Sequence, residues 1–238
     1  MNPPAVLFER RGPVALATLN RPHVLNAYDR AMRDALFEIL EAVRDDPEVR
    51  VLILGGNGSS FCSGGDLTEF GSAPSPLTAR ETRWRRDVWG ALTALSQVTI
   101  AAVHGYVVGG GFEMALLCDL CVAAEDSRFS YPETARGMIP GVGGTQTTSR
   151  SVGLGRSLDM VLTGRTIDAI EARRLGFVCR VAGCHDLRDV ALDLAGTIAA
   201  LPPRLVRRLK RAVSEGLELP LPAALELEHR LSLQDSNP

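Results

Sequence analysis

The stretch HGYVVGGGFEMALLCD, residues 104–119, contains one complete unit of the expected fold: the end of a strand, a glycine-rich turn and an apolar helix. Three consecutive glycines, Gly109, Gly110 and Gly111, precede a helical pattern that carries Glu113. Each glycine costs roughly 0.5–1 kcal/mol relative to alanine. Amides exposed at a helix N-terminus would stabilise negative charge, whereas the structural alternative is a tight turn for close packing of helix and strand.

Strand and helix patterns lead up to this unit. Residues 5–20 alternate in polarity around a Gly-Pro pair, which predicts a hairpin. The apolar spacing of 30–46 predicts an amphipathic helix, and 49–56 is typical of a buried strand. We expect a surface loop at 71–79, which is rich in Ser, Pro and Gly. A second helix should follow, with apolar positions at Trp84, Val88, Leu92 and Leu95.

The same design repeats downstream. Segments 98–105 and 119–124 have strand patterns on either side of the expected helix at 109–118. From about Gly141 the pattern becomes helical, with one strand-like interruption at 177–183. Repeated strand, glycine-rich turn and helix favour a mixed α/β fold, followed here by a helical C-terminal region.

Composition and charge exclude several classes of function. The chain has 238 residues, of which 45% are hydrophobic and 23% charged, as in an ordinary globular protein. Its net charge of −2 provides no basic field for nucleic acid or an anionic membrane. The N-terminus has no signal-peptide pattern, and no apolar run approaches the roughly 18 residues of a membrane span. We therefore expect a cytoplasmic protein.

The cysteine pattern favours thiols over bridges. An odd number of cysteines in a chain of this length indicates buried, reduced thiols rather than a disulfide framework. A zinc site at the CDLC spacing of 118–121 is a minor alternative, because no histidine ligand lies nearby. We expect no metal. The five cysteines are Cys62, Cys118, Cys121, Cys179 and Cys184.

A second glycine-rich turn, FCSGGDL at 61–67, also follows a buried strand. Its Gly64-Gly65 pair can expose backbone amides in the same way as the first turn. Two amides that converge from separate turns would form an oxyanion hole, which suits a carbonyl oxygen that gains charge as an enolate or a tetrahedral intermediate. The two turns together favour a functional role for both.

The sequence does not contain the other glycine-rich motifs that are typical of nucleotide-binding proteins and serine hydrolases. Neither GGGFEM nor GVGGTQ completes a dinucleotide-binding G-x-G-x-x-G, and no G-x-x-x-x-G-K-[ST] occurs. The nucleophile elbow G-x-S-x-G is also missing, which argues against a serine hydrolase of that design.

Five ordered motifs resemble the enoyl-CoA hydratase/isomerase (crotonase) family. They are LNRPHVLNA at 19–27, FCSGGDL at 61–67, HGYVVGGGFEMALLCD at 104–119, YPETARGMIPGVGGTQ at 131–146 and GRTIDAIEARRLGFV at 164–178. The resemblance implies a crotonase-like α/β spiral of β-β-α turns over residues 1–195 and a helical trimerisation region over 196–238. It also implies a homotrimer or hexamer, an acyl-CoA thioester substrate, and no cofactor beyond the coenzyme A of that substrate.

Carried over by position, the resemblance implies four catalytic positions. Gly65 and Gly110 would supply the oxyanion amides, and Glu113 and Glu133 would be the acid/base pair of the hydratase branch. Adding water to a 2,3-enoyl thioester needs an electron sink at the carbonyl oxygen, a base for water and a proton for the α-carbon. Two neighbouring carboxyl groups can supply both proton functions, because like charges raise one apparent pKa.

The resemblance further implies a substrate-binding wall. In this chain His23 stands where a lysine or arginine is common, Arg21 can compensate, and Ser63 replaces a usual alanine. The chain is also short of the last helix of many family members, which bears on CoA affinity and acyl selectivity. The implied binding residues are Arg21, His23, Val24, Leu25, Ala27, Ser63, Gly64, Asp66 and Leu67.

Alternatives to a hydratase stay open at this point. An isomerase or another crotonase-type lyase would use mainly Glu133 as its base, and a non-catalytic acyl-CoA-binding subunit would use neither glutamate. Three other polar residues are expected to be structural: His104 in a turn, Asp66 as a cap or brace of its loop, and Asp119 at a helix end.

Overall fold

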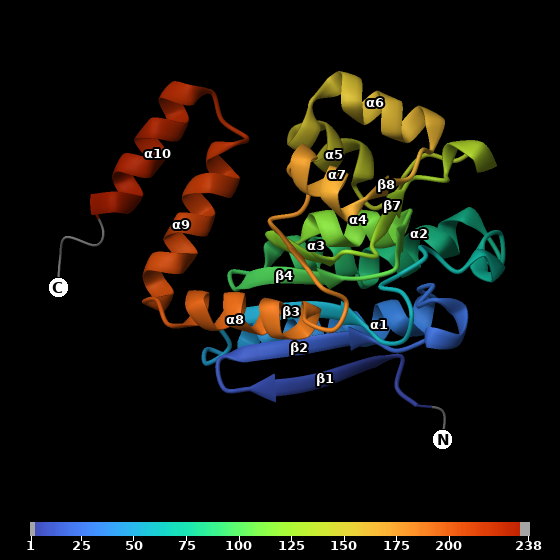
Figure 1. The fold of residues 1–238 in the computed structure, drawn as a ribbon, viewed down its shortest axis with the longest axis horizontal. Coiled ribbons are helices and arrows are strands. Elements are labelled where there is room, and N and C mark those ends of the chain that lie inside the picture. Colours follow the sequence, from blue (N-terminus) through green and yellow to red (C-terminus); the bar gives the residue numbers. More distant parts are fainter. Residues whose placement is uncertain (1–2, 234–238) are drawn as a thin grey trace.

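The computed structural model describes residues 3–233, except the side chains at positions 76, 79, 82 and 83, so 234–238 of the predicted C-terminal region lie outside it. Helices pack on both faces of a large sheet (Figure 1). Its first two strands pair antiparallel and the other neighbours are parallel. The strand order is β1 (Val6–Arg11), β2 (Val14–Leu19), β3 (Val51–Gly56), β4 (Val98–Val103), β6 (Leu120–Ala124) and β9 (Arg180–Ala182).

A smaller sheet lies beside the large one and creates the repeated turn. It contains β5 (Tyr106–Val108), β7 (Arg128–Ser130) and β8 (Ile167–Asp168). The chain passes from β4 through β5 into α4 (Gly110–Leu117), and from β6 through β7 towards α5 (Gly144–Val152). This strand-strand-helix repetition confirms the expected α/β architecture.

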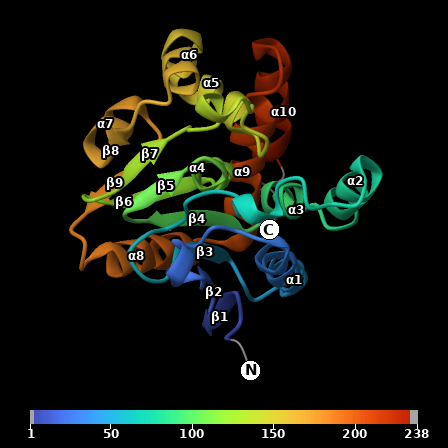
Figure 2. The same ribbon diagram turned by 90° about the vertical axis from the view of Figure 1, so that its right-hand side faces the viewer.

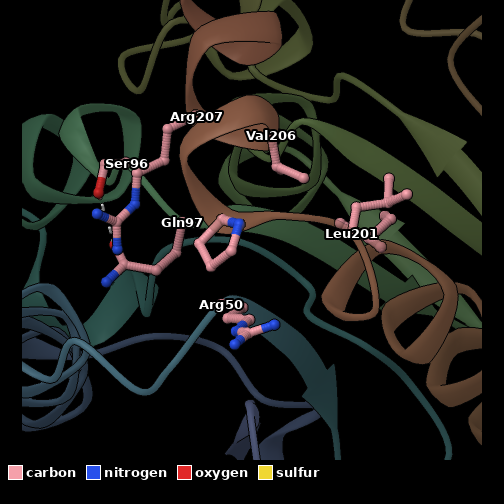
Figure 3. Close-up of a pocket in the computed structure, with 8 residues that line it drawn as sticks. Arg50, Ser96, Gln97, Leu201, Val206 and Arg207 are labelled. Carbon is pink, nitrogen blue, oxygen red and sulfur yellow. Dashed lines mark hydrogen bonds between the residues drawn. The ribbon is translucent and has the colours of Figure 1, made fainter. Parts of the chain in front are cut away.

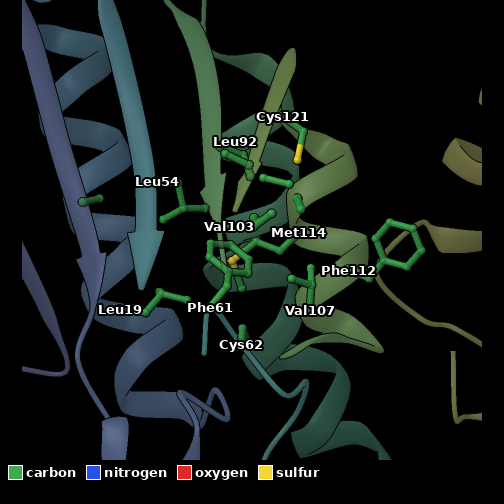
Figure 4. Close-up of a cluster of buried hydrophobic side chains, with 14 of the residues drawn as sticks. Leu19, Leu54, Phe61, Cys62, Leu92, Val103, Val107, Phe112, Met114 and Cys121 are labelled. Atoms are coloured by element: carbon green, nitrogen blue, oxygen red, sulfur yellow. The ribbon is translucent and has the colours of Figure 1, made fainter. Parts of the chain in front are cut away.

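Alternation along the strands divides the core into two layers. In β3, Leu52 and Leu54 belong to the cluster that includes α1 (Arg30–Asp45), whereas Val51 and Ile53 belong to the cluster beneath α8 (Leu187–Ala199). Figure 4 shows part of the first cluster, where β3 and β4 side chains meet α4. Because β3 and β4 are covered on both faces, their apolar residues run almost without interruption.

The region between β3 and β4 differs from the prediction in two respects. The expected loop at 71–79 ends at Ser75, whose hydroxyl accepts the Thr78 N–H at 3.1 Å and caps α2 (Pro76–Arg85). The expected single helix is wrong, because Asp87 caps a separate helix α3 (Val88–Ala94). Trp84 is consequently 68% exposed and does not join the core.

The C-terminal half is helical, as predicted, and ends in two helices that pack on each other at one side of the molecule (Figures 1 and 2). The predicted boundary at residue 195 falls within α8, and the division into regions and the trimerisation role stay predictions. No helix in the described part of the chain combines the length and apolarity that crossing a membrane requires. The remaining helices are α6 (Leu154–Thr163), α7 (Ala169–Leu175), α9 (Pro203–Gly216) and α10 (Leu221–Leu233).

The cysteines are unpaired, but the prediction that all are buried is wrong for two of them. Cys62 and Cys121 are buried within the sheet region, whereas Cys179 and Cys184 are exposed. The exposed pair flanks β9, so these positions lie at one edge of the large sheet.

Lys210 fastens α9 to the core. Its Nζ donates to the carbonyls of Leu95 (2.8 Å) and Gln97 (2.9 Å) and to Asp119 (2.7 Å), while the side chain is only 15% exposed. Asp119 also accepts the N–H of Thr99, which confirms its structural role.

Replacing Lys210 by methionine is expected to lower the free energy of unfolding by about 2 kcal/mol, because the Asp119 carboxylate and two backbone carbonyls lose their donor. Urea unfolding measures this loss. Arg211→Met is the matched control, since Arg211 forms an exposed pair with Glu215 worth at most about 0.5 kcal/mol. Equal losses in the two variants would contradict the anchoring role.

Candidate active site

Each glycine of the first turn has its own structural reason. Gly109 has φ +53°, a left-handed conformation that side chains rarely adopt. A Cβ on Gly110 would overlap the Tyr28 hydroxyl, and a Cβ on Gly111 would overlap the carbonyl oxygen of Cys62. The Gly110 N–H, in the first turn of α4, has no acceptor among the described residues. The glycines therefore permit close packing and also leave an amide available.

The second glycine-rich turn lies directly against the first. The Val108 N–H donates to the Cys62 carbonyl at 3.0 Å. A Cβ on Gly64 would stand 3.4 Å from the Gly110 nitrogen. Within residues 3–233 the Gly65 N–H, like that of Gly110, finds no hydrogen-bond acceptor. The structure thus brings together the two turns that the sequence predicted separately.

Glu113 lies in the first turn of α4 and is 2% exposed. Its Oε1 accepts the N–H groups of Val142 (2.8 Å) and Gly144 (2.7 Å) at the start of α5. Burial raises the pKa of Glu113, and the amide hydrogen bonds oppose that rise. A Cβ on Gly144 would come within 2.8 Å of the Glu113 Cγ, so the glycine there makes room for the carboxylate.

The Glu133 carboxylate also lies beside the first glycine-rich turn, but it belongs to a different segment of the chain. It follows β7 and Pro132 and precedes a short 3-10 helix, η3 (Thr134–Arg136). Its Oε2 is buried and has no hydrogen-bond partner in the described structure, and a Cβ on Gly109 would overlap its Oε1. Burial, with the negative charge of Glu113 as a further cause, raises the pKa of Glu133. Two coupled carboxyl groups therefore adjoin the glycine-rich turns.

A family profile described as enoyl-CoA hydratase/isomerase matches residues 9–236. The chain belongs to this family. A probable enoyl-CoA hydratase of Mycobacterium bovis is 38% identical over 226 residues, covering 95% of this chain and 87% of the relative. The short-chain-enoyl-CoA hydratase of Clostridium acetobutylicum is 34% identical over 224 residues, covering 94% and 86%. The crystal structure of an enoyl-CoA hydratase from Bacillus anthracis aligns with TM-score 0.90 at 34% identity, covering 96% and 89%.

In this enoyl-CoA hydratase/isomerase family member, the residues predicted to bind CoA come from two paired segments. The Ser63 N–H donates to the Leu25 carbonyl at 3.0 Å, and the Tyr28 N–H to the Gly64 carbonyl at 2.9 Å. The two segments thereby form one wall that ends at Gly65. Contact of this wall with CoA stays a prediction.

Arg21 of this wall is engaged inside the protein. Its Nη1 donates to the Ala27 carbonyl (2.6 Å) and to Asp66 (2.9 Å), and its Nη2 lies 3.3 Å from Asp29. Asp66 also accepts from Thr68, and these bonds, with those from Thr68 foremost, lower the pKa of Asp66. The predicted bracing role of Asp66 is confirmed.

His104 also has the structural role that the sequence predicts. Its Nε2 lies 3.0 Å from the carbonyl oxygen of Gly58 and so links the strand end to the preceding loop.

Sequence reasoning missed Tyr28, although it directly follows the LNRPHVLNA motif. Its ring packs edge-on against Trp89 with centroids 5.3 Å apart. A Cβ on Gly65 would stand 3.6 Å from this ring. Tyr28 and Gly65 line a cleft of about 670 Å³ that extends along the start of α1 and residues 69–75. The cleft is therefore open to the second glycine-rich turn.

A much smaller cavity lies far from this chemistry, where α9 meets the core (Figure 3). Its volume is about 10 Å³, and its lining includes Arg50, Gln97 and Val206. Arg50 has a structural contact there, because its Nη1 donates a hydrogen bond to the Ala199 carbonyl at 2.7 Å. The cavity is too small for a substrate and marks an imperfectly packed helix junction.

Glu133→Gln is expected to raise the free energy of unfolding at pH 8 by about 1 kcal/mol, because it removes a buried charge whose Oε2 has no partner. The folded-state pKa of Glu133 lies above 4.5, so ionisation weakens the folded wild type as pH rises through that pKa. The gain should vanish below pH 4.5.

Urea unfolding at pH 4 and pH 8 measures this effect. The exposed Glu48→Gln serves as the control and should show no gain at either pH. A gain for Glu133→Gln that persists unchanged at pH 4 would contradict the explanation by charge.

Proposed function

We propose that this protein is an enoyl-CoA hydratase that adds water across the 2,3 double bond of an enoyl-CoA thioester. The observation that carries the proposal is the meeting of Glu113, Glu133 and the Gly109–Gly111 turn at one place. The family membership and the names of the relatives support an acyl-CoA thioester as substrate.

In the proposed reaction, the backbone amides stabilise the negative charge and the two glutamates transfer the protons. The thioester oxygen accepts hydrogen bonds from the amides of Gly65 and Gly110, which stabilise the enolate that forms when water oxygen bonds to C3. The glutamate pair accepts one proton from that water and delivers one to C2, so that the net change is the addition of one water molecule. Coenzyme A takes part only as the thiol portion of the substrate.

The raised pKa values of both glutamates suit this exchange. A carboxyl group whose pKa lies above its usual range can hold a proton closer to neutral pH, while its neighbour stays ionised. Glu113 is also rigidly placed by two amides, which favours a hydratase over an isomerase that relies on Glu133 alone.

Product analysis tests the assignment. With a 2-enoyl-CoA in water enriched in oxygen-18, mass spectrometry should show a product heavier by one labelled water. With a 3-enoyl-CoA, we expect slow conversion or none. Rapid isomerisation of the 3-enoyl-CoA without uptake of label from the 2-enoyl-CoA would instead assign the site to an isomerase.

A further inference from the structure

The cleft beside Gly65 has charged lining residues that the proposed hydration does not use. Its volume of about 670 Å³ lies in the range of small-molecule sites. Its lining joins Tyr28 and Gly65 to residues 69–75, to Thr78 and Arg80, and to two arginines of α1, Arg30 and Arg33. A substrate group that extends from the thioester into this cleft would therefore meet positive charge.

Arg33 is the least exposed of the arginines that line the cleft and has hydrogen-bonding capacity left. Its side chain is 22% exposed, and its Nε is buried with no hydrogen-bond partner in the described structure. The nearest acid, Glu69, has its Oε2 3.9 Å from the Arg33 Nη2, beyond hydrogen-bonding distance. Because the Nε is buried, a planar anion in the cleft would be bound by the two terminal Nη groups of this partly exposed guanidinium, through two parallel hydrogen bonds.

The acidic groups of the cleft are already occupied. Asp66 lines the cleft and is paired at 2.9 Å with Arg21, which does not line it. Glu69 uses its Oε1 to accept the Arg30 N–H at 2.9 Å. Arg80, also in the lining, is exposed and lies over the Trp84 ring. The lining thus combines three arginines with two acids, of which one is neutralised, and favours an anionic occupant.

The direction of the cleft decides which part of the substrate could supply that anion. In an acyl-CoA thioester, the acyl chain and the CoA sulfur are bonded to the carbonyl carbon on different sides, so the two parts extend in different directions. His23, Leu25 and Ser63 of the proposed CoA wall do not line the cleft, and the wall meets the cleft only at its end, at Gly65 and Asp66. If CoA follows that wall, the cleft remains for the acyl chain.

We propose that the substrate is an enoyl-CoA whose acyl chain ends in a carboxylate, and that Arg33 binds this carboxylate. The proposal rests on the function proposed above and names its substrate class. The anion could also be a phosphate of CoA, and the test separates the two sources.

The test compares matched pairs of 2-enoyl-CoAs, five to eight carbons long, that end in either a methyl or a carboxylate group. Wild type is expected to favour the carboxylate end in kcat/KM by about tenfold or more at one chain length. Arg33→Met should lower kcat/KM for that substrate by about 10- to 100-fold and change the methyl-ended partner less than about threefold.

The matched control is Arg44→Met, which changes an exposed arginine on the same helix and should leave both substrates unaffected. The selective loss should persist with N-acetylcysteamine thioesters, which carry no phosphate. Equal losses of both CoA substrates in Arg33→Met would assign the anion to CoA and overturn the proposal, as would a wild-type preference for the methyl end.

A binding measurement separates this proposal from the hydratase assignment. Calorimetric titration with the corresponding saturated acyl-CoAs needs no turnover. Tighter binding of the carboxylate-ended ligand, lost in Arg33→Met, would support the carboxylate site even if no hydration occurred. Hydration without any such preference would overturn the carboxylate site and leave the hydratase assignment intact.

Discussion

Glu113→Gln and Glu133→Gln are each expected to lower kcat for hydration of a 2-enoyl-CoA by roughly 10²–10⁴-fold. Each change removes one partner of a proton exchange that needs both a base and an acid. Glutamine keeps the shape of the side chain and can still accept the Val142 and Gly144 amides at position 113, so the fold should be retained. The enoyl absorbance, followed at saturating substrate, measures the loss.

The double variant makes this prediction sharper. Because the two carboxyl groups act as a unit on one water, Glu113→Gln/Glu133→Gln should be about as slow as the slower single variant. Glu48→Gln, which changes an exposed glutamate at the end of the α1–β3 connection, is the control and should retain wild-type kcat. Losses that multiply in the double variant would show that the glutamates act independently.

Gly110→Ala is expected to lower kcat by about 10²–10³-fold, the loss typical of one missing oxyanion donor. The added Cβ would overlap the Tyr28 hydroxyl and ring, so either the ring or the start of α4 must move. Movement of α4 displaces the Gly110 N–H from the position where it would meet the thioester oxygen, and movement of the ring changes the cleft beside Gly65. Steady-state kinetics measures the loss, which should fall on kcat more than on KM.

Gly155→Ala is the matched control for this change. Gly155 also lies near the start of a helix, α6, but a Cβ there meets nothing within 4 Å. The control should keep full activity, and circular dichroism should show native helix content in both variants. A Gly110→Ala enzyme with kcat within about threefold of wild type would remove this amide from the mechanism.

Much of the site could be predicted because it depends on short, local patterns. A glycine-rich turn between a buried strand and a helix requires only neighbouring residues, and both turns are present where the sequence indicated them. Glu113 follows from its position in the first turn of α4, and Glu133 from its motif after β7. The resemblance to a family then related these separate positions to one reaction.

What could not be predicted depends on contacts between distant segments. The approach of Gly64 to Gly110 is set by the pairing of Cys62 with Val107, which no local pattern reveals. The engagement of Arg21 with Asp29 and Asp66 likewise appears only when three segments meet.

The break between α2 and α3 has a local cause that apolar spacing conceals. Asp87 caps the second helix, but the surrounding residues continue a helical pattern. The cleft at Arg33 was missed because a charged residue on an amphipathic helix usually faces solvent.

The most direct test of the account follows the enoyl absorbance of purified protein with crotonyl-CoA and longer 2-enoyl-CoAs, including chains that end in a carboxylate. We predict rapid loss of absorbance in wild type on at least one of these substrates. Absence of turnover at every chain length, despite measurable binding of the same thioesters, would contradict the hydratase assignment and favour a non-catalytic acyl-CoA-binding protein or a different crotonase-type reaction.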